Sequence, residues 1–137
     1  MSKENNIAIQ QKFGEAVNTG NLEELRTIVS DTCIEHDPAP DQKPGAQGYI
    51  DFFTMMRSAF PDFKIKVVNL VADEESVSFA YSASGTHSAE FMGLPATGKT
   101  FEARGMQTSR FEDGKMVERW GSSDELGILK QLGASVR

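Results

Sequence analysis

The sequence predicts a single α+β domain, with helices packed on one face of a curved antiparallel sheet. Apolar residues recur at helical spacing as far as Pro61. Beyond it they alternate with polar residues, which is typical of half-buried strands. Helices followed by a run of strands indicate an α+β fold. The chain has 137 residues, enough for one hydrophobic core but not for two, so we expect residues 1–137 to form one domain.

Helical spacing predicts about three helices in the N-terminal half. The first ends near Thr19–Gly20, because glycine commonly terminates helices. Asn21 and Glu24 have the spacing of an N-cap pair that opens the second helix. A short strand over residues 32–37 separates it from the third. That helix carries an apolar stripe made of Tyr49, Phe52, Phe53, Met56 and Phe60.

Four further strands and a short last helix are expected. Alternating polarity around residues 63–67 and 77–82 predicts two strands, joined by a turn at 73–76. A loop over residues 87–99 then leads to a hairpin, whose turn is Asp113–Gly114. Asp-Gly is a strong signal for a two-residue hairpin turn. A sheet curved around helices leaves an open mouth, where a ligand would enter.

The hairpin turn also predicts a pocket face. If both strands are regular, Gln107 lies opposite Trp120 and Ser109 lies opposite Glu118, and opposed residues share a face. That face combines apolar walls with a few polar groups, the composition of a small-molecule pocket. Its members are Phe101, Gln107, Phe111, Met116, Glu118, Trp120 and Asp124. The opposite face receives Arg104, Arg110 and Arg119, which would pair with acidic residues or contact a partner; a β-bulge would reverse the assignment of Arg104.

Asp124 is the leading candidate for proton transfer, and it has a structural alternative. It directly precedes the last helix, where aspartate is a favoured N-cap. Capping would lower the pKa of its carboxyl group, whereas burial at an apolar mouth would raise it. The two roles are compatible. Trp120 is open to two interpretations as well, as a core residue or as a platform for a ligand.

The two histidines are the other candidates for acid–base chemistry. His87 shares strand parity with Phe79 and Tyr81, and His36 shares it with Ile34, so both could face the apolar side. Histidine moves protons near neutral pH, which suits work beside a carboxylate. The alternative is that each is a hydrogen-bonded histidine of the core or rim.

Composition excludes several function classes. The net charge of −6 argues against nucleic acids and anionic membranes. No signal peptide or bilayer-spanning run is visible, and the lone Cys33 is compatible with a reducing cytoplasm. Its acidic neighbours argue against a reactive thiol. No metal-ligand spacing, phosphate loop or dinucleotide fingerprint is present, so we expect neither a metal nor a cofactor.

The chain resembles the SnoaL-like polyketide cyclase, or ester cyclase, family over nearly its whole length. The residues that carry the resemblance are His36, Pro38, Phe60-Pro61-Asp62, Gly85-Thr86-His87, Phe91, Gly93, Pro95, Thr97-Gly98-Lys99, Asp113-Gly114-Lys115, Glu118, Trp120, Asp124 and Gln131-Leu132-Gly133. This resemblance implies the nuclear-transport-factor-2-like fold, a cone-shaped and strongly bent sheet closed by helices and usually dimeric. It also implies that the aspartate matching Asp124 is the acid/base of an intramolecular aldol ring closure that needs no metal.

The chain departs from the family pattern at one chemically relevant place. Cyclases of the family keep a histidine on the strand before the hairpin, and residues 106–110 contain none; Gln107 and Ser109 are the nearest polar groups. Ala89 and Ala96 also replace a glycine and a proline of the usual loop.

We therefore expect a cofactor-independent enzyme that acts on a small, apolar, carbonyl-containing ligand in the cytoplasm, as a homodimer. Asp124, His87 and His36 are the expected catalytic residues. Gln107, Trp120, Glu118, Phe53, Met116 and Phe91 are the expected substrate-binding residues. The alternatives are a non-catalytic module that binds an apolar metabolite and an assembly domain that uses the outer face of the sheet.

Overall fold

The computed structural model describes residues 2–135. Its elements are α1 (Lys3–Thr19), the 3-10 helix η1 (Leu22–Thr27), β1 (Val29–Glu35), α2 (Gly45–Ala59), β2 (Lys64–Ala72), β3 (Ser76–Thr86), β4 (Thr100–Glu112), β5 (Lys115–Ser123) and α3 (Glu125–Gln131). The strands form one sheet in the order β1-β5-β4-β3-β2. All neighbours are antiparallel except β1 and β5, which are parallel. The predicted α+β class is confirmed.

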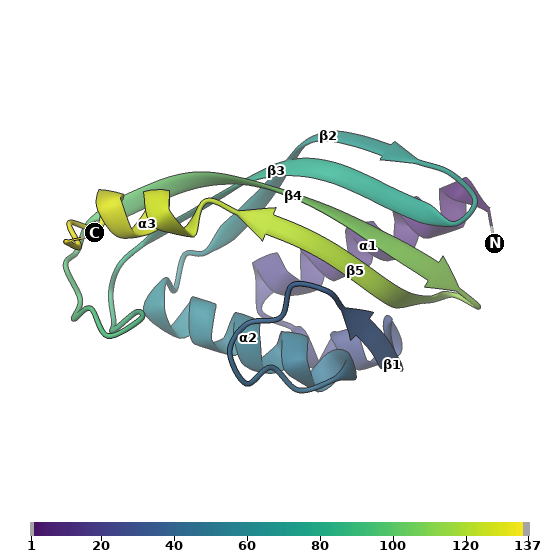
Figure 1. Ribbon diagram of the computed structural model, residues 1–137, viewed down its shortest axis with the longest axis horizontal. Helices are drawn as coiled ribbons and strands as arrows, with labels where there is room; N and C mark the ends of the chain where they lie inside the picture. The colour runs from purple at the N-terminus through teal and green to yellow at the C-terminus, as the bar shows by residue number, and fades with distance from the viewer. Residues whose placement is uncertain (1, 136–137) are drawn as a thin grey trace.

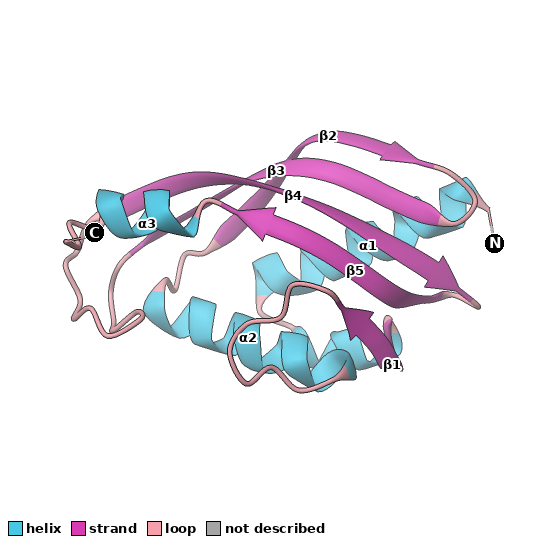
Figure 2. Ribbon diagram, viewed as in Figure 1, coloured by secondary structure: helices cyan, strands magenta, loops and turns pink. Residues whose placement is uncertain are grey.

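Helices α1 and α2 lie on the same side of the bent sheet, and α3 follows β5 at the end near the C-terminus (Figures 1 and 2). Side chains of alternating strand residues point into the space between the sheet and these helices, as the strict burial alternation along β3 indicates. The core therefore lies between the helices and the inner face of the sheet. No helix within the described residues is long and apolar enough to cross a membrane.

The first predicted helix is confirmed, and the second is corrected. Helix α1 ends at Gly20, which has a φ of 84° and closes the last turn. The Asn21 side chain does not cap a backbone N–H; it donates to Glu24 Oε2 at 3.3 Å. The segment is a six-residue 3-10 helix, because strand β1 already begins at Val29 and leaves no length for further α-helical turns.

A β-bulge in β5 changes the predicted register of the hairpin. Phe111 lies opposite Met116, as predicted, but Arg110 lies opposite Glu118 and Ser109 opposite Arg119. Val117 is therefore the extra residue of β5. A one-residue shift moves every following side chain to the other face of the sheet. The predicted pairing of Ser109 with Glu118 and of Gln107 with Trp120 is wrong for this reason.

Candidate active site

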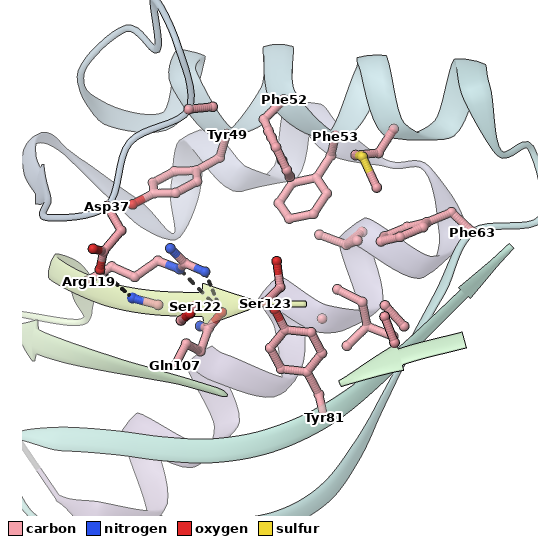
Figure 3. Close-up of a pocket in the computed structure, with 18 of the residues that line it drawn as sticks. Asp37, Tyr49, Phe52, Phe53, Phe63, Tyr81, Gln107, Arg119, Ser122 and Ser123 are labelled. Carbon is pink, nitrogen blue, oxygen red and sulfur yellow. Dashed lines mark hydrogen bonds between the residues drawn. The ribbon is translucent and has the colours of Figure 1, made fainter. Parts of the chain in front are cut away.

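A cavity of about 1010 Å³ lies between the inner face of the sheet and the two long helices (Figure 3). Its walls are largely aromatic and aliphatic, with Phe13 from α1, Phe52 and Phe53 from α2, and Phe79 and Tyr81 from β3. Gly105 makes room for Tyr81, because a side chain on Gly105 would collide with its ring. This volume and lining suit a small, mostly apolar molecule.

One side of the cavity is polar, and Arg119 is at its centre. Its Nη1 donates to Glu35 Oε1 at 2.6 Å. Its Nε and Nη2 donate to Gln107 Oε1 at 3.2 and 3.0 Å (Figure 3). Tyr49 Oη donates to the same Glu35 oxygen at 3.1 Å. The side chains of Arg119 and Glu35 are only 18% and 10% exposed. Four side chains from β1, α2, β4 and β5 thus form one hydrogen-bonded network on the cavity wall.

Two ionisable groups, Tyr49 of this network and the neighbouring Cys33, are held neutral. Burial raises the pKa of the Tyr49 hydroxyl, and the nearby Cys33 and Glu35 add to the effect. Burial likewise raises the pKa of the Cys33 thiol to about 11, although its contact with Tyr49 opposes the shift. A protonated thiol is a poor nucleophile.

Cys33 is therefore expected to resist alkylation in the folded protein. Iodoacetamide at about pH 8 should modify it slowly in native protein and fast in urea, because the reactive species is the thiolate. Mass spectrometry of the intact chain over time measures both rates. Equal rates in the two conditions would contradict the burial and the raised pKa described above.

Asp124 lies at the junction of β5 and α3 and contributes to the cavity lining. Its Oδ1 accepts the N–H of Gly127 at 2.8 Å, so the predicted N-cap is confirmed. The residue is exposed. The carboxylate is thus within reach of both solvent and a ligand in the cavity.

The bulge places Glu118 and Trp120 on the outer face of the sheet rather than in the cavity, and His36 lies beside them on that face. His36 Nε2 and Glu118 Oε2 are 2.6 Å apart, and the His36 ring stacks on Trp120 at 4.6 Å between centroids. Arg110 Nε donates to Glu118 Oε1 at 2.8 Å, and Arg110 and His36 together lower the pKa of Glu118. The expectation that these three residues line the ligand site is corrected.

His87 and Met116 are buried but do not line the cavity. His87 follows β3 and is fully buried; its Nδ1 accepts the N–H of Thr97 at 3.2 Å, and its ring contacts Phe60. Met116 lies in the core directly before the bulge. The other residues expected there, Gln107, Phe53 and Phe91, do line the cavity. The described residues contain no group of three or more His, Cys, Asp or Glu side chains that could hold a metal ion.

The sequence and the fold match a known family. A sequence model of SnoaL-like polyketide cyclases matches residues 7–132. The chain belongs to this family. DnrD, the aklanonic acid methyl ester cyclase of Streptomyces peucetius, is 24% identical in an alignment covering 93% of this chain and 90% of DnrD.

Solved structures agree with the family assignment. IdmH of Streptomyces antibioticus is 34% identical to this SnoaL-like chain, with a TM-score of 0.81 over 94% of this chain and 99% of IdmH. TsrD of Streptomyces laurentii is 23% identical and similar in fold, with a TM-score of 0.89 over 98% of this chain and 99% of TsrD. The predicted nuclear-transport-factor-2-like fold is confirmed.

Sequence reasoning missed Arg119, Glu35 and Tyr49 as cavity residues of this SnoaL-like protein. A regular hairpin puts Arg119 outside, and the apolar Ile34 suggested that its neighbour Glu35 faces solvent. One signal was available: a bulge at Val117 sets Arg110 directly opposite Glu118, and opposite charges stabilise cross-strand pairs.

Proposed function

We propose that this SnoaL-like protein is a cofactor-independent cyclase or isomerase that does acid–base chemistry on a small, carbonyl-containing, polyketide-like ligand. The observation that carries the proposal is an apolar cavity of about 1010 Å³ with the Asp124 carboxylate in its lining. Family membership and the aklanonic acid methyl ester cyclases among its relatives support it.

In the proposed reaction, Asp124 removes an acidic proton from the carbon next to a carbonyl group. The carbanion attacks a second carbonyl carbon of the same molecule, and the new alkoxide receives a proton. The product is an isomer of the substrate, so no cofactor is consumed. The cavity contributes by holding the two reacting carbons together, which removes an entropic barrier.

Gln107 and the aromatic residues Phe53 and Phe91 keep their proposed role in ligand binding, because they line the cavity. His36 and His87 have no catalytic role in the proposal, because one lies on the outer face and the other is enclosed by core residues. Of the three catalytic residues expected from the sequence, Asp124 therefore keeps its role in the proposal, as the acid/base.

Aklanonic acid methyl ester, the substrate named for DnrD, is a suitable first test compound. Incubation with the purified protein should yield a product of unchanged mass and altered retention time on a chiral column. Saturable binding without any altered product would favour the alternative, a non-catalytic binding module. Absence of both binding and product would reject this ligand class.

We further propose that the protein is a cytoplasmic homodimer of one ester-cyclase-like domain per chain. Apolar side chains are exposed on the outer face of the sheet; they include Val71, Met106 and Trp120, which are 63%, 62% and 39% exposed. Exposed apolar patches commonly mark protein interfaces. A monomer mass in light scattering at high protein concentration would contradict the dimer and weaken the assembly role of this face.

A further inference from the structure

We infer that Arg119 is the carbonyl-binding group of the cavity, and that the carbonyl ligand it holds is neutral: a ketone, ester or quinone rather than a free carboxylate. The inference deepens the proposed function and rests on it, because it assumes a carbonyl-containing ligand in this cavity. It adds a binding residue on the polar wall, at a different place from Asp124.

Arg119 has hydrogen-bond donors left for a ligand. A guanidinium group carries five N–H groups, two of them on each terminal nitrogen. The contacts to Glu35 and Gln107 use one on Nε, one on Nη1 and one on Nη2. One N–H on each terminal nitrogen therefore has no partner among the described residues. Arg119 lines the cavity, so a carbonyl oxygen there can accept from it.

The guanidinium is held in place by its surroundings. Glu35 and Gln107 fix it from two strands, and Tyr49 in turn holds Glu35. Gly121 follows two residues later on the same face of β5, and a Cβ there would lie 2.5 Å from Arg119 Nη2. The absence of a side chain at Gly121 thus makes the space that the guanidinium occupies. A pre-positioned donor binds without the cost of ordering a flexible side chain.

The charges of the lining favour a neutral ligand. Among the described residues that line the cavity, Arg119 is the one basic side chain, and Glu35 already neutralises it. The remaining charged lining residues are acidic: Glu15, Asp37, Asp124 and Glu125. A carboxylate ligand would meet this excess of negative charge, whereas a neutral carbonyl would gain a charge-assisted hydrogen bond without that repulsion.

Arg119 and Asp124 act at separate positions along the cavity. Five residue steps on an extended chain correspond to roughly 16 Å between their Cα atoms. A ligand whose one carbonyl is bound by Arg119 would present a more distant carbon to Asp124. Arg119 is thus a residue that orients the ligand, and Asp124 is the one that moves the proton.

Three matched probes test the inference. β-Acetonaphthone carries a ketone, β-isopropenylnaphthalene replaces its oxygen by a methylene group, and β-naphthoate carries a carboxylate. Equilibrium dialysis gives a dissociation constant for each. The probes differ in their free energy of transfer from water to an apolar cavity, so their affinities for one variant cannot be compared directly. The informative quantity is the ratio of ketone affinity to alkene affinity, compared between variants.

Removal of Arg119 alone would leave Glu35 uncompensated, so the substitution is made in a Glu35→Gln background. The Glu35→Gln variant gives the reference ratio, because it keeps Arg119 and its contacts with Gln107. In the Glu35→Gln/Arg119→Met variant the ketone-to-alkene affinity ratio should be about tenfold lower than in Glu35→Gln, which corresponds to the loss of one hydrogen bond from a charged donor. The affinity for the alkene should be unchanged. Arg104→Met, on the outer face of the neighbouring strand, is the matched control and should leave the ratio unchanged.

Two results would overturn the inference. One is an unchanged ratio in the double variant; the other is tighter binding of β-naphthoate than of β-acetonaphthone to the wild type, which would make Arg119 a carboxylate anchor. Binding of the alkene in either case would show that the cavity still takes apolar ligands. The proposed reaction is tested separately, by conversion of the methyl ester, so the two can fail independently.

Discussion

Replacement of Asp124 by asparagine is expected to reduce ring-closing turnover by at least about a hundredfold while ligand affinity is preserved, because general acid–base catalysis contributes that much or more. Asparagine is nearly isosteric with aspartate, but its amide cannot accept and return the proton. Single-turnover conversion of aklanonic acid methyl ester measures the rate, and equilibrium dialysis measures the affinity.

The double role of Asp124 makes the choice of substitution important. Asparagine is as good an N-cap as aspartate, so its Oδ1 can still accept the Gly127 N–H. The loss of the negative charge at the helix N-terminus should cost less than about 1 kcal/mol. Asp124→Ala is the control that also removes the cap, at a further cost of about 1 kcal/mol. Turnover by Asp124→Asn at the wild-type rate would remove Asp124 from the mechanism.

Replacement of Arg119 by methionine is expected to lower the free energy of unfolding by about 3 kcal/mol, because it leaves the Glu35 carboxylate in a largely enclosed site without its cationic partner. The Glu35 side chain is only 10% exposed. Adding Glu35→Gln should restore most of the loss, since the amide carries no charge to desolvate. Urea unfolding of the two single variants and the double variant forms a double-mutant cycle.

Arg110 provides the matched control on the other face of the same sheet. It pairs with Glu118 and Glu112 at 2.8 Å, but its side chain is 34% exposed. Arg110→Met should lower the free energy of unfolding clearly less than Arg119→Met does, as is usual for ion pairs that water can reach. If Arg110→Met and Arg119→Met lowered the free energy of unfolding equally, the cavity network would be no better shielded from solvent than the ion pairs on the outer face.

Local signals in the sequence predicted the framework of the domain well. Gly20 ends α1 because a left-handed φ is required there, and glycine adopts it without strain. Asp113 and Gly114 both have positive φ values, as a two-residue hairpin turn requires. These features depend on the residues at the turn itself, so a single sequence suffices to find them.

The polar wall of the cavity depends on contacts that local patterns do not reveal. Glu35 and Arg119 are 84 positions apart in the sequence, and each alone has the polarity of an exposed strand residue. Glu35 lies opposite Arg119 in the sheet, and Arg119 faces inward because of the bulge at Val117. A regular alternation of residues therefore predicted the correct strands and the wrong inner face for the second half of β5.

The bulge at Val117 has a consequence for how proteins of this architecture can diverge. Loss of this one residue would restore regular pairing from the turn onward. The side chains of Glu118 and Trp120 would then face the cavity, and that of Arg119 would lie on the outer face. The groups that β5 offers to a ligand would switch from the Arg119 cation to a carboxylate with an indole. A single-codon deletion or insertion near the hairpin turn is thus a larger chemical change to the cavity than most substitutions within it.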